Sequence, residues 1–162
     1  MLNTGYNKVT KEREDKTMTI YFDMDGTIAN LYSVDNWLTK LINEDESPYR
    51  EAKPLVRLSS LARVLNRLQR NGHRLGIVSW LAKNSTSEYD EKVTDAKINW
   101  LNTHLNSVKF DEVHIVPYGT PKSEVVNDKN GILFDDEEPN RTNWKGTAHD
   151  VHNIIEVLKG IK

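Results

Sequence analysis

The sequence contains no cysteine, no long apolar run and no excess of either charge. Without cysteine, the chain has no disulfides, no thiolate metal sites and no cysteine nucleophile. No segment approaches the roughly 20 consecutive apolar residues that a membrane span needs. The first residues also lack the apolar core of a signal peptide. We therefore expect a cytoplasmic protein with no membrane partner.

The charges nearly balance, since 22 basic and 24 acidic side chains give a formal net charge of −2. Nucleic acid is therefore not favoured as an obligatory partner, although the average would hide a local basic patch. A length of 162 residues with 37% hydrophobic and 28% charged side chains is typical of one globular domain. The sequence leaves the oligomeric state open.

Short apolar runs alternate with helical periodicity over most of the chain. Residues 1–17 are polar and charged, which predicts a flexible tail before a domain at 18–162. The segments TIYF, RLGIVSW, EVHIVPY and GILF are expected to be strands. Helices are expected around 58–68 and 93–105, at SEVV, and over 151–158. This order predicts an α/β fold, a Rossmann-like parallel sheet flanked by helices.

The segment 31–54 interrupts this alternation. It contains a helical pattern at VDNWLTKLI and then a polar stretch, NEDESPYREAKP. We expect it to form a small cap over the strand ends, with Tyr32 and Trp37 as candidates for substrate contact. Trp100 and Trp144 are expected in the core.

Polar side chains follow the end of each predicted strand. In chain order they are Asp23 and Asp25, then Ser79, Lys122, and finally Asp135 and Asp136. Because ligands bind at the carboxyl ends of strands in open parallel sheets, we expect these groups to meet at one edge.

Carboxylates gathered in this way repel one another unless a cation lies between them. Asp23, Asp135 and Asp136 offer the oxygen ligands that Mg²⁺ prefers. A magnesium-bound Asp23 is also suited to attack phosphorus and form an aspartyl-phosphate. Asp25, two residues further on, is placed to act as acid and then as base.

The remaining groups suit a phosphate. Gly26 lets the backbone come close, so that amides of the turn at Gly26 and Thr27 are expected to face phosphate oxygens. Ser79 offers a hydroxyl and Trp80 a backbone amide. Lys122 offers a positive charge for the negative charge that develops during phosphoryl transfer.

These motifs resemble those of the haloacid dehalogenase-like (HAD) phosphohydrolases. DMDGT is similar to the first motif of that superfamily, and GIVS, ending at Ser79, is similar to the second. Lys122 resembles the third motif and ILFDDEEPN the fourth, all in the order of the family. Lys129 is a competitor for the third motif, but its NDKNG context is typical of a surface turn.

The resemblance implies a Rossmann-like core, magnesium dependence, Asp23 as nucleophile and Asp25 as acid/base. It also implies that the metal takes a side-chain oxygen of Asp23, the backbone carbonyl of Asp25 and a carboxylate of Asp135. Asp136 is expected to hydrogen-bond to the site. An aspartate at position 25 is what the phosphatase branches of the family carry.

A narrower resemblance concerns the substrate. KINWLNTHL, and DDEEPNRTNW with Gly146, look like the 5'-nucleotidase and deoxyribonucleotidase branch, although the insert here is shorter than the helical cap of that branch. This implies a phosphomonoesterase for nucleoside 5'-monophosphates or deoxynucleotides. Nucleic-acid ends, another small metabolite, phosphate transfer to another acceptor and a non-catalytic HAD-like binding module are the alternatives. Asn140 and Arg141 are expected either to steady the acidic loop or to touch substrate.

Overall fold

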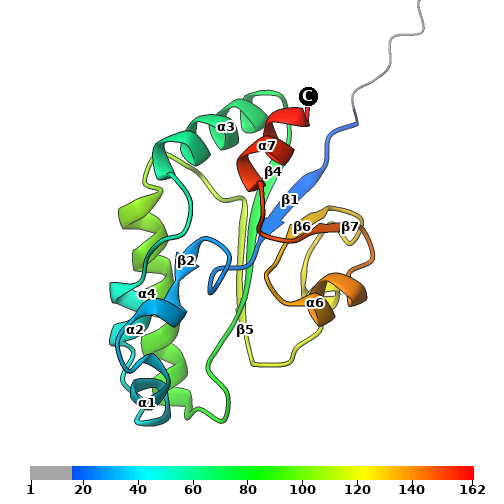
Figure 1. Cartoon of the computed structure of the whole chain (residues 1–162). Helices are drawn as coiled ribbons and strands as arrows, with labels where there is room; N and C mark the ends of the chain where they lie inside the picture. Colours follow the sequence, from blue (N-terminus) through cyan, green and yellow to red (C-terminus); the bar gives the residue numbers. More distant parts are fainter. Residues whose placement is uncertain (1–15) are drawn as a thin grey trace, which may run out of the picture.

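A five-stranded parallel sheet lies at the centre of the structure, a computed structural model that describes residues 16–162. The strand order is β5-β4-β1-β6-β7, and each neighbouring pair is parallel (Figure 1). The strands are β1 (Thr19–Phe22), β4 (Arg74–Trp80), β5 (Glu112–Val116), β6 (Ile132–Phe134) and β7 (Thr147–His149). The predicted tail at 1–17 lies outside the described residues except for its last two positions.

Helices cover both faces of this sheet. The elements that follow the strands are α3 (Leu58–Arg70), α4 (Ser87–His104), α5 (Lys122–Val125), α6 (Glu138–Asn143) and α7 (Ile154–Gly160). Because side chains alternate along a strand, Phe22 packs in one cluster with residues of α3, α4 and α7. Its neighbour Tyr21 packs in another cluster, with Val126 after α5 and Trp144 after α6.

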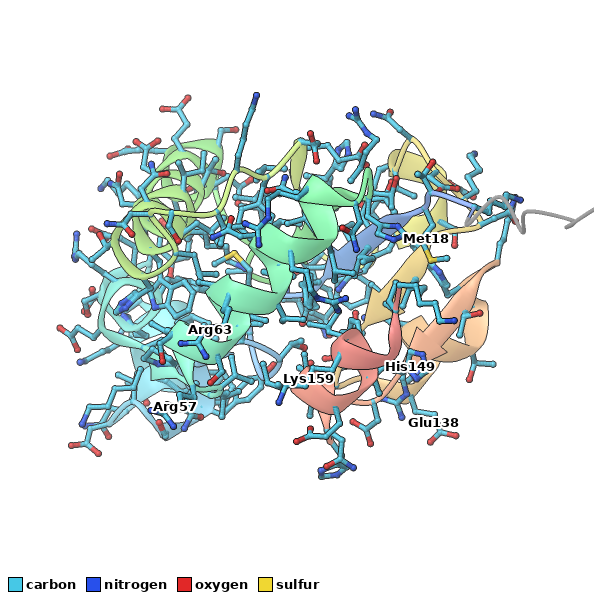
Figure 2. All side chains as sticks on the ribbon, turned by 90° about the horizontal axis from the view of Figure 1, so that it is seen from above. Met18, Arg57, Arg63, Glu138, His149 and Lys159 are labelled. Carbon is cyan, nitrogen blue, oxygen red and sulfur yellow. The ribbon has the colours of Figure 1, made fainter. Side chains whose placement is uncertain are left out.

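α3 shows why the sequence forms these layers. Leu61, Leu65 and Leu68 recur at helical spacing and are buried against the sheet. The opposite side is polar, and the view from above shows Arg63 of α3 and Lys159 of α7 pointing away from the core (Figure 2). α3 and α7 are joined where Arg67 donates a hydrogen bond to the carbonyl of Leu158 at 3.0 Å.

A small insert follows β1. It consists of β2 (Ala29–Asn30), a 3-10 turn (Leu31–Ser33), α1 (Trp37–Ile42), α2 (Ser47–Glu51) and β3 (Lys53–Pro54), with β2 and β3 antiparallel. Trp100 of α4 donates to the carbonyl of Ala52 at 2.7 Å, and the Tyr89 hydroxyl donates to that of Asp45 at 3.1 Å. These bonds fix the insert to α4. Its role as a cap stays a prediction.

The structure confirms the predicted α/β class, a parallel sheet flanked by helices with a small insert. Trp100 and Trp144 are buried, as predicted. The sequence did not predict β7 or α6, and the last helix begins at Ile154, so that Val151 precedes it. Over residues 16–162, no helix combines the length and apolar character needed to cross a bilayer.

Candidate active site

Three aspartates meet at the carboxyl ends of β1 and β6. These strands are neighbours, and Phe22 pairs with Phe134, so the residues that follow them lie side by side. One carboxylate oxygen from each of Asp23, Asp135 and Asp136 lies within 4.8 Å of the others. Asp135 is fully buried and Asp23 nearly so. The predicted meeting of these side chains is what the structure shows.

Lys122, the first residue of α5, lies between two of these carboxylates. Its Nζ donates to Asp23 Oδ1 at 2.9 Å and to Asp135 Oδ2 at 2.6 Å. Burial alone would lower the pKa of Lys122, but the two carboxylates outweigh it and raise the pKa to about 12. The side chain is therefore a fixed cation, and its contact with a phosphate stays a prediction.

The loop after β6 is stabilised by hydrogen bonds within residues 135–141. The amide of Glu137 donates to Asp135 Oδ1 at 2.9 Å, and Asn140 Nδ2 donates to Asp135 Oδ2 at 3.2 Å. Arg141 donates to the carbonyl of Asp135 at 3.0 Å. Both Asn140 and Arg141 therefore steady the acidic loop, and Asn140 also lines the cavity described below.

Asp25 is held by a residue to which the sequence analysis gave no role. Lys97 of α4 donates from Nζ to Asp25 Oδ2 at 2.7 Å. Burial raises the pKa of the Asp25 carboxyl, and the Lys97 ammonium opposes that rise. Two signals were available in the sequence: Lys97 is the first residue of KINWLNTHL, and it lies within the buried helix face that carries Val93, Ala96 and Trp100.

The turn after Asp25 differs from expectation in how its amides are used. Gly26 has a φ of +77°, and its amide donates to the carbonyl of Ala29 at 2.9 Å. The Thr27 amide donates to the carbonyl of Met24, while its hydroxyl lies 3.3 Å from both Asp23 Oδ2 and Asp136 Oδ1. These groups complete the turn and brace the carboxylates instead of facing a phosphate.

Glycine is nevertheless required at position 26. A Cβ there would lie 2.3 Å from Asp136 Oδ2, and the positive φ is strained for any other residue.

Ser79 and Trp80 end β4 beside this cluster. Ser79 is fully buried, and its Oγ accepts a hydrogen bond from Lys97 at 2.8 Å. The Trp80 ring lines the cavity, lies 5.3 Å from Lys122 Nζ and donates from Nε1 to the carbonyl of Thr120 at 2.8 Å. Phosphate binding by the Ser79 hydroxyl and the Trp80 amide stays a prediction.

A cavity of about 550 Å³ opens over Asp23, Asp25 and Lys122. Aromatic pairs line it on two sides: Tyr32 and Trp37 of the insert, with ring centres 5.0 Å apart, and Trp80 and Tyr118, 4.9 Å apart. The carboxylates thus lie at the polar end of a largely apolar pocket, whose walls are aromatic and aliphatic side chains.

The donor set fits a hard divalent cation. Burial, followed by the charge of Asp23, raises the pKa of Asp135 to about 6 and that of Asp136 to about 7. Three carboxylates against one ammonium leave an excess of negative charge, and oxygen ligands of this kind suit Mg²⁺. Asp23, Asp135 and Asp136 are therefore the residues that would hold the ion.

Known proteins resemble this chain in fold alone. No family model and no curated protein matches it. A chain of the Pnkp1/Rnl/Hen1 RNA repair complex matches at a TM-score of 0.55 and 14% identity, over 87% of this chain and 47% of that one. A chain in a second structure of the Pnkp1/Rnl/Hen1 complex also matches at a TM-score of 0.55 and 14% identity, over 84% of this chain and 46% of that one.

D,D-heptose 1,7-bisphosphate phosphatase from Burkholderia thailandensis matches at a TM-score of 0.48 and 14% identity, over 78% of this chain and 70% of that one. The present chain spans about half the length of the two chains from the Pnkp1/Rnl/Hen1 structures, because the aligned regions cover only 47% and 46% of those chains. The two Pnkp1/Rnl/Hen1 matches show a shared fold, and both the HAD family and its nucleotidase branch stay proposals.

Magnesium is expected to stabilise the protein far more at pH 7.5 than at pH 5. In the metal-free protein Asp135 and Asp136 carry raised pKa values of about 6 and 7, so at pH 5 protons occupy the carboxylates and compete with the ion. At a Mg²⁺ concentration one hundred times Kd, binding adds about 2.7 kcal/mol to the free energy of unfolding. This corresponds to a rise in Tm of roughly 5–10 °C for a chain of this size.

Thermal unfolding at both pH values, with and without Mg²⁺, measures this difference. The exposed Asp95→Asn variant should keep the shift and Asp135→Asn should lose it. An equal shift at both pH values would place the ion elsewhere.

Proposed function

We propose that this protein is a magnesium-dependent phosphomonoesterase that works through an aspartyl-phosphate and hydrolyses nucleoside 5'-monophosphates or deoxynucleotides. One observation carries the proposal: Lys122 bridges Asp23 and Asp135 at 2.9 and 2.6 Å, next to Asp25, at the end of an open cavity. A nucleophile and an acid/base from the segment after β1 thus meet a fixed cation from α5, and Asp135 joins them from a third segment, after β6.

The chain's own residues account for the bond changes. A carboxylate oxygen of Asp23 attacks phosphorus, and the bond from phosphorus to the leaving oxygen breaks. Asp25 gives its proton to that oxygen, so an alcohol departs. Water then attacks the phosphorus of the aspartyl-phosphate while Asp25 takes its proton, and inorganic phosphate leaves with Asp23 restored.

The other groups neutralise the charge of the transferring phosphoryl group and orient the carboxylates. Lys122 stabilises the equatorial oxygens of the transferring group, as an ammonium does in phosphoryl transfer. A bound Mg²⁺ would supply further positive charge for the same oxygens. Asn140 and Thr27 keep the carboxylates of Asp135 and Asp23 in place through the hydrogen bonds described above.

The walls of the cavity support a nucleotide as substrate. A nucleobase is flat and stacks on aromatic side chains. Tyr32 and Trp37 from the insert, with Trp80 at the end of β4 and Tyr118 just after β5, offer such surfaces around the cavity. A volume of about 550 Å³ lies within the usual range of small-ligand pockets.

A phosphorylated nucleic-acid end is the second candidate. Lys83 is exposed at the cavity rim, with its ammonium 5.9 Å from the Tyr118 ring, where the phosphate of a neighbouring nucleotide would be attracted. The likeness in fold to a chain of an RNA repair complex also favours this candidate over other small metabolites.

The test is phosphate release from a panel of nucleoside monophosphates, sugar phosphates and 3'- or 5'-phosphorylated oligonucleotides, each with Mg²⁺ and with EDTA. We expect magnesium-dependent release from nucleoside 5'-monophosphates. Excess 3'-phosphorylated oligonucleotide should block that turnover only if the nucleic-acid end is the true substrate. No release from any compound by folded, magnesium-loaded protein would favour a binding module or a phosphotransferase.

A further inference from the structure

Lys97 is the most deeply buried cation in the described part of the chain, with 1% of its surface exposed. Its ammonium makes three hydrogen bonds, to Asp25 Oδ2 at 2.7 Å, to Ser79 Oγ at 2.8 Å and to the carbonyl of Trp80 at 2.7 Å. The ring centre of Tyr49, from the insert, lies 5.0 Å from Nζ. Three N–H donors thus meet three acceptors in a fixed arrangement.

An isolated charge in such a place would be strongly unfavourable. Lys97 is tolerated because Asp25 pairs with it and neutral oxygens satisfy its other protons. The cluster joins α4, the end of β4 and the turn after β1, so it ties the acid/base to a rigid helix. None of the steps described for the proposed activity uses this lysine.

The hydrogen bond from Lys97 makes the two carboxylate oxygens of Asp25 different from each other. Oδ2 accepts from the ammonium at 2.7 Å, so a proton on the carboxyl belongs on Oδ1. Asp25 lines the cavity, and its side chain is 18% exposed while that of Lys97 is 1% exposed. Oδ1 is therefore the oxygen left for a ligand in the cavity.

We propose that Lys97 is a positioning residue for departure of the leaving group: it holds Asp25 by Oδ2, so that Oδ1 carries the proton and faces the leaving oxygen. This rests on the proposed function. As the bond from phosphorus to the leaving oxygen breaks, the Oδ1 proton moves to that oxygen. The carboxylate that remains is already paired with the ammonium, so no side chain has to move.

Leaving groups of different basicity test this role. Departure of an alkoxide, as from thymidine 5'-monophosphate, needs a proton, whereas p-nitrophenolate departs with little help. We expect Lys97→Met to lower kcat/KM about 100-fold for the nucleotide and less than about fivefold for p-nitrophenyl phosphate. Lys97→Arg, which keeps the charge, should recover most of the loss. Lys92→Met, an exposed change on the same helix, is the control.

A double-mutant cycle covers the case in which Lys97→Met folds poorly. Asp25→Asn removes the carboxylate that the lysine compensates, so the double variant leaves no unpaired charge. In that background we expect Lys97→Met to cause no further loss with the nucleotide, because both changes remove the same step. Equal losses on both substrates, or additive losses in the cycle, would reduce Lys97 to a structural role.

Two further outcomes separate the proposals. If the wild-type protein releases phosphate from neither compound, the proposed function fails. A crystal structure of Lys97→Met in which the Asp25 carboxylate keeps its place would contradict the positioning role, whatever the activity.

Discussion

Asp23→Asn is expected to abolish turnover while the protein stays folded. Asparagine has nearly the same shape, but its amide cannot form the aspartyl-phosphate, so a loss of at least about 10⁴-fold in kcat is expected. Stability should hold, because the change removes one of three crowded negative charges and still leaves Lys122 paired with Asp135 at 2.6 Å. Phosphate release and thermal unfolding measure the two effects.

Asp95→Asn is the matched control for this substitution. It makes the same chemical change at an exposed position of α4 and should leave activity and Tm as they were. Activity near the wild-type level in Asp23→Asn would remove the nucleophile from the proposal, and with it the mechanism. Loss of the fold in Asp23→Asn would leave Asp23 as a structural ion-pair partner of Lys122.

The sequence was informative wherever apolar runs are long or motifs are dense. Arg74–Trp80 is continuously apolar near its centre and was recognised as a strand, because a strand buried on both faces leaves that pattern. Thr147–His149 and Glu138–Asn143 are short and polar, and their pairing or packing comes from neighbours far along the chain. Local pattern carries no signal for such elements.

Some features of the candidate site could likewise be predicted from the sequence, and others could not. The meeting of Asp23, Lys122 and Asp135 was expected because each comes after a predicted strand, and the carboxyl ends of parallel strands share one edge of the sheet. The use of Gly26 and Lys97 did not follow from the sequence. Which amide closes a turn, and whether a helix lysine points inward or to solvent, depends on contacts that only the folded chain creates.

Lys122→Met is expected to lower both the activity and the stability of the metal-free protein at neutral pH. Removing one partner of a buried ion pair costs about 3–5 kcal/mol, or roughly 10 °C in Tm for this chain length. The cause is that Asp23 and Asp135 lose the ammonium that lies 2.9 and 2.6 Å from them. Thermal unfolding in EDTA at pH 7.5 measures the loss.

The pH dependence of that loss distinguishes electrostatics from packing. The folded pKa values of about 6 for Asp135 and about 7 for Asp136 are raised above the unfolded value near 3.8. A group with a raised carboxyl pKa favours the folded state fully below its unfolded pKa, and this advantage disappears as pH rises through its folded pKa. Between pH 4 and 7 the cluster therefore loses stability, and Lys122 offsets part of that loss.

In Lys122→Met the offset is gone, so the deficit relative to wild type should be large at pH 7.5 and small at pH 5, where protons replace the ammonium. Mg²⁺ at pH 7.5 should recover part of the deficit, because the ion supplies the missing positive charge. A deficit equal at both pH values, and unchanged by Mg²⁺, would mean that the lysine stem fills space and that its charge is not what holds the three carboxylates together. The same result would weaken the assignment of this cluster as a phosphate and metal site.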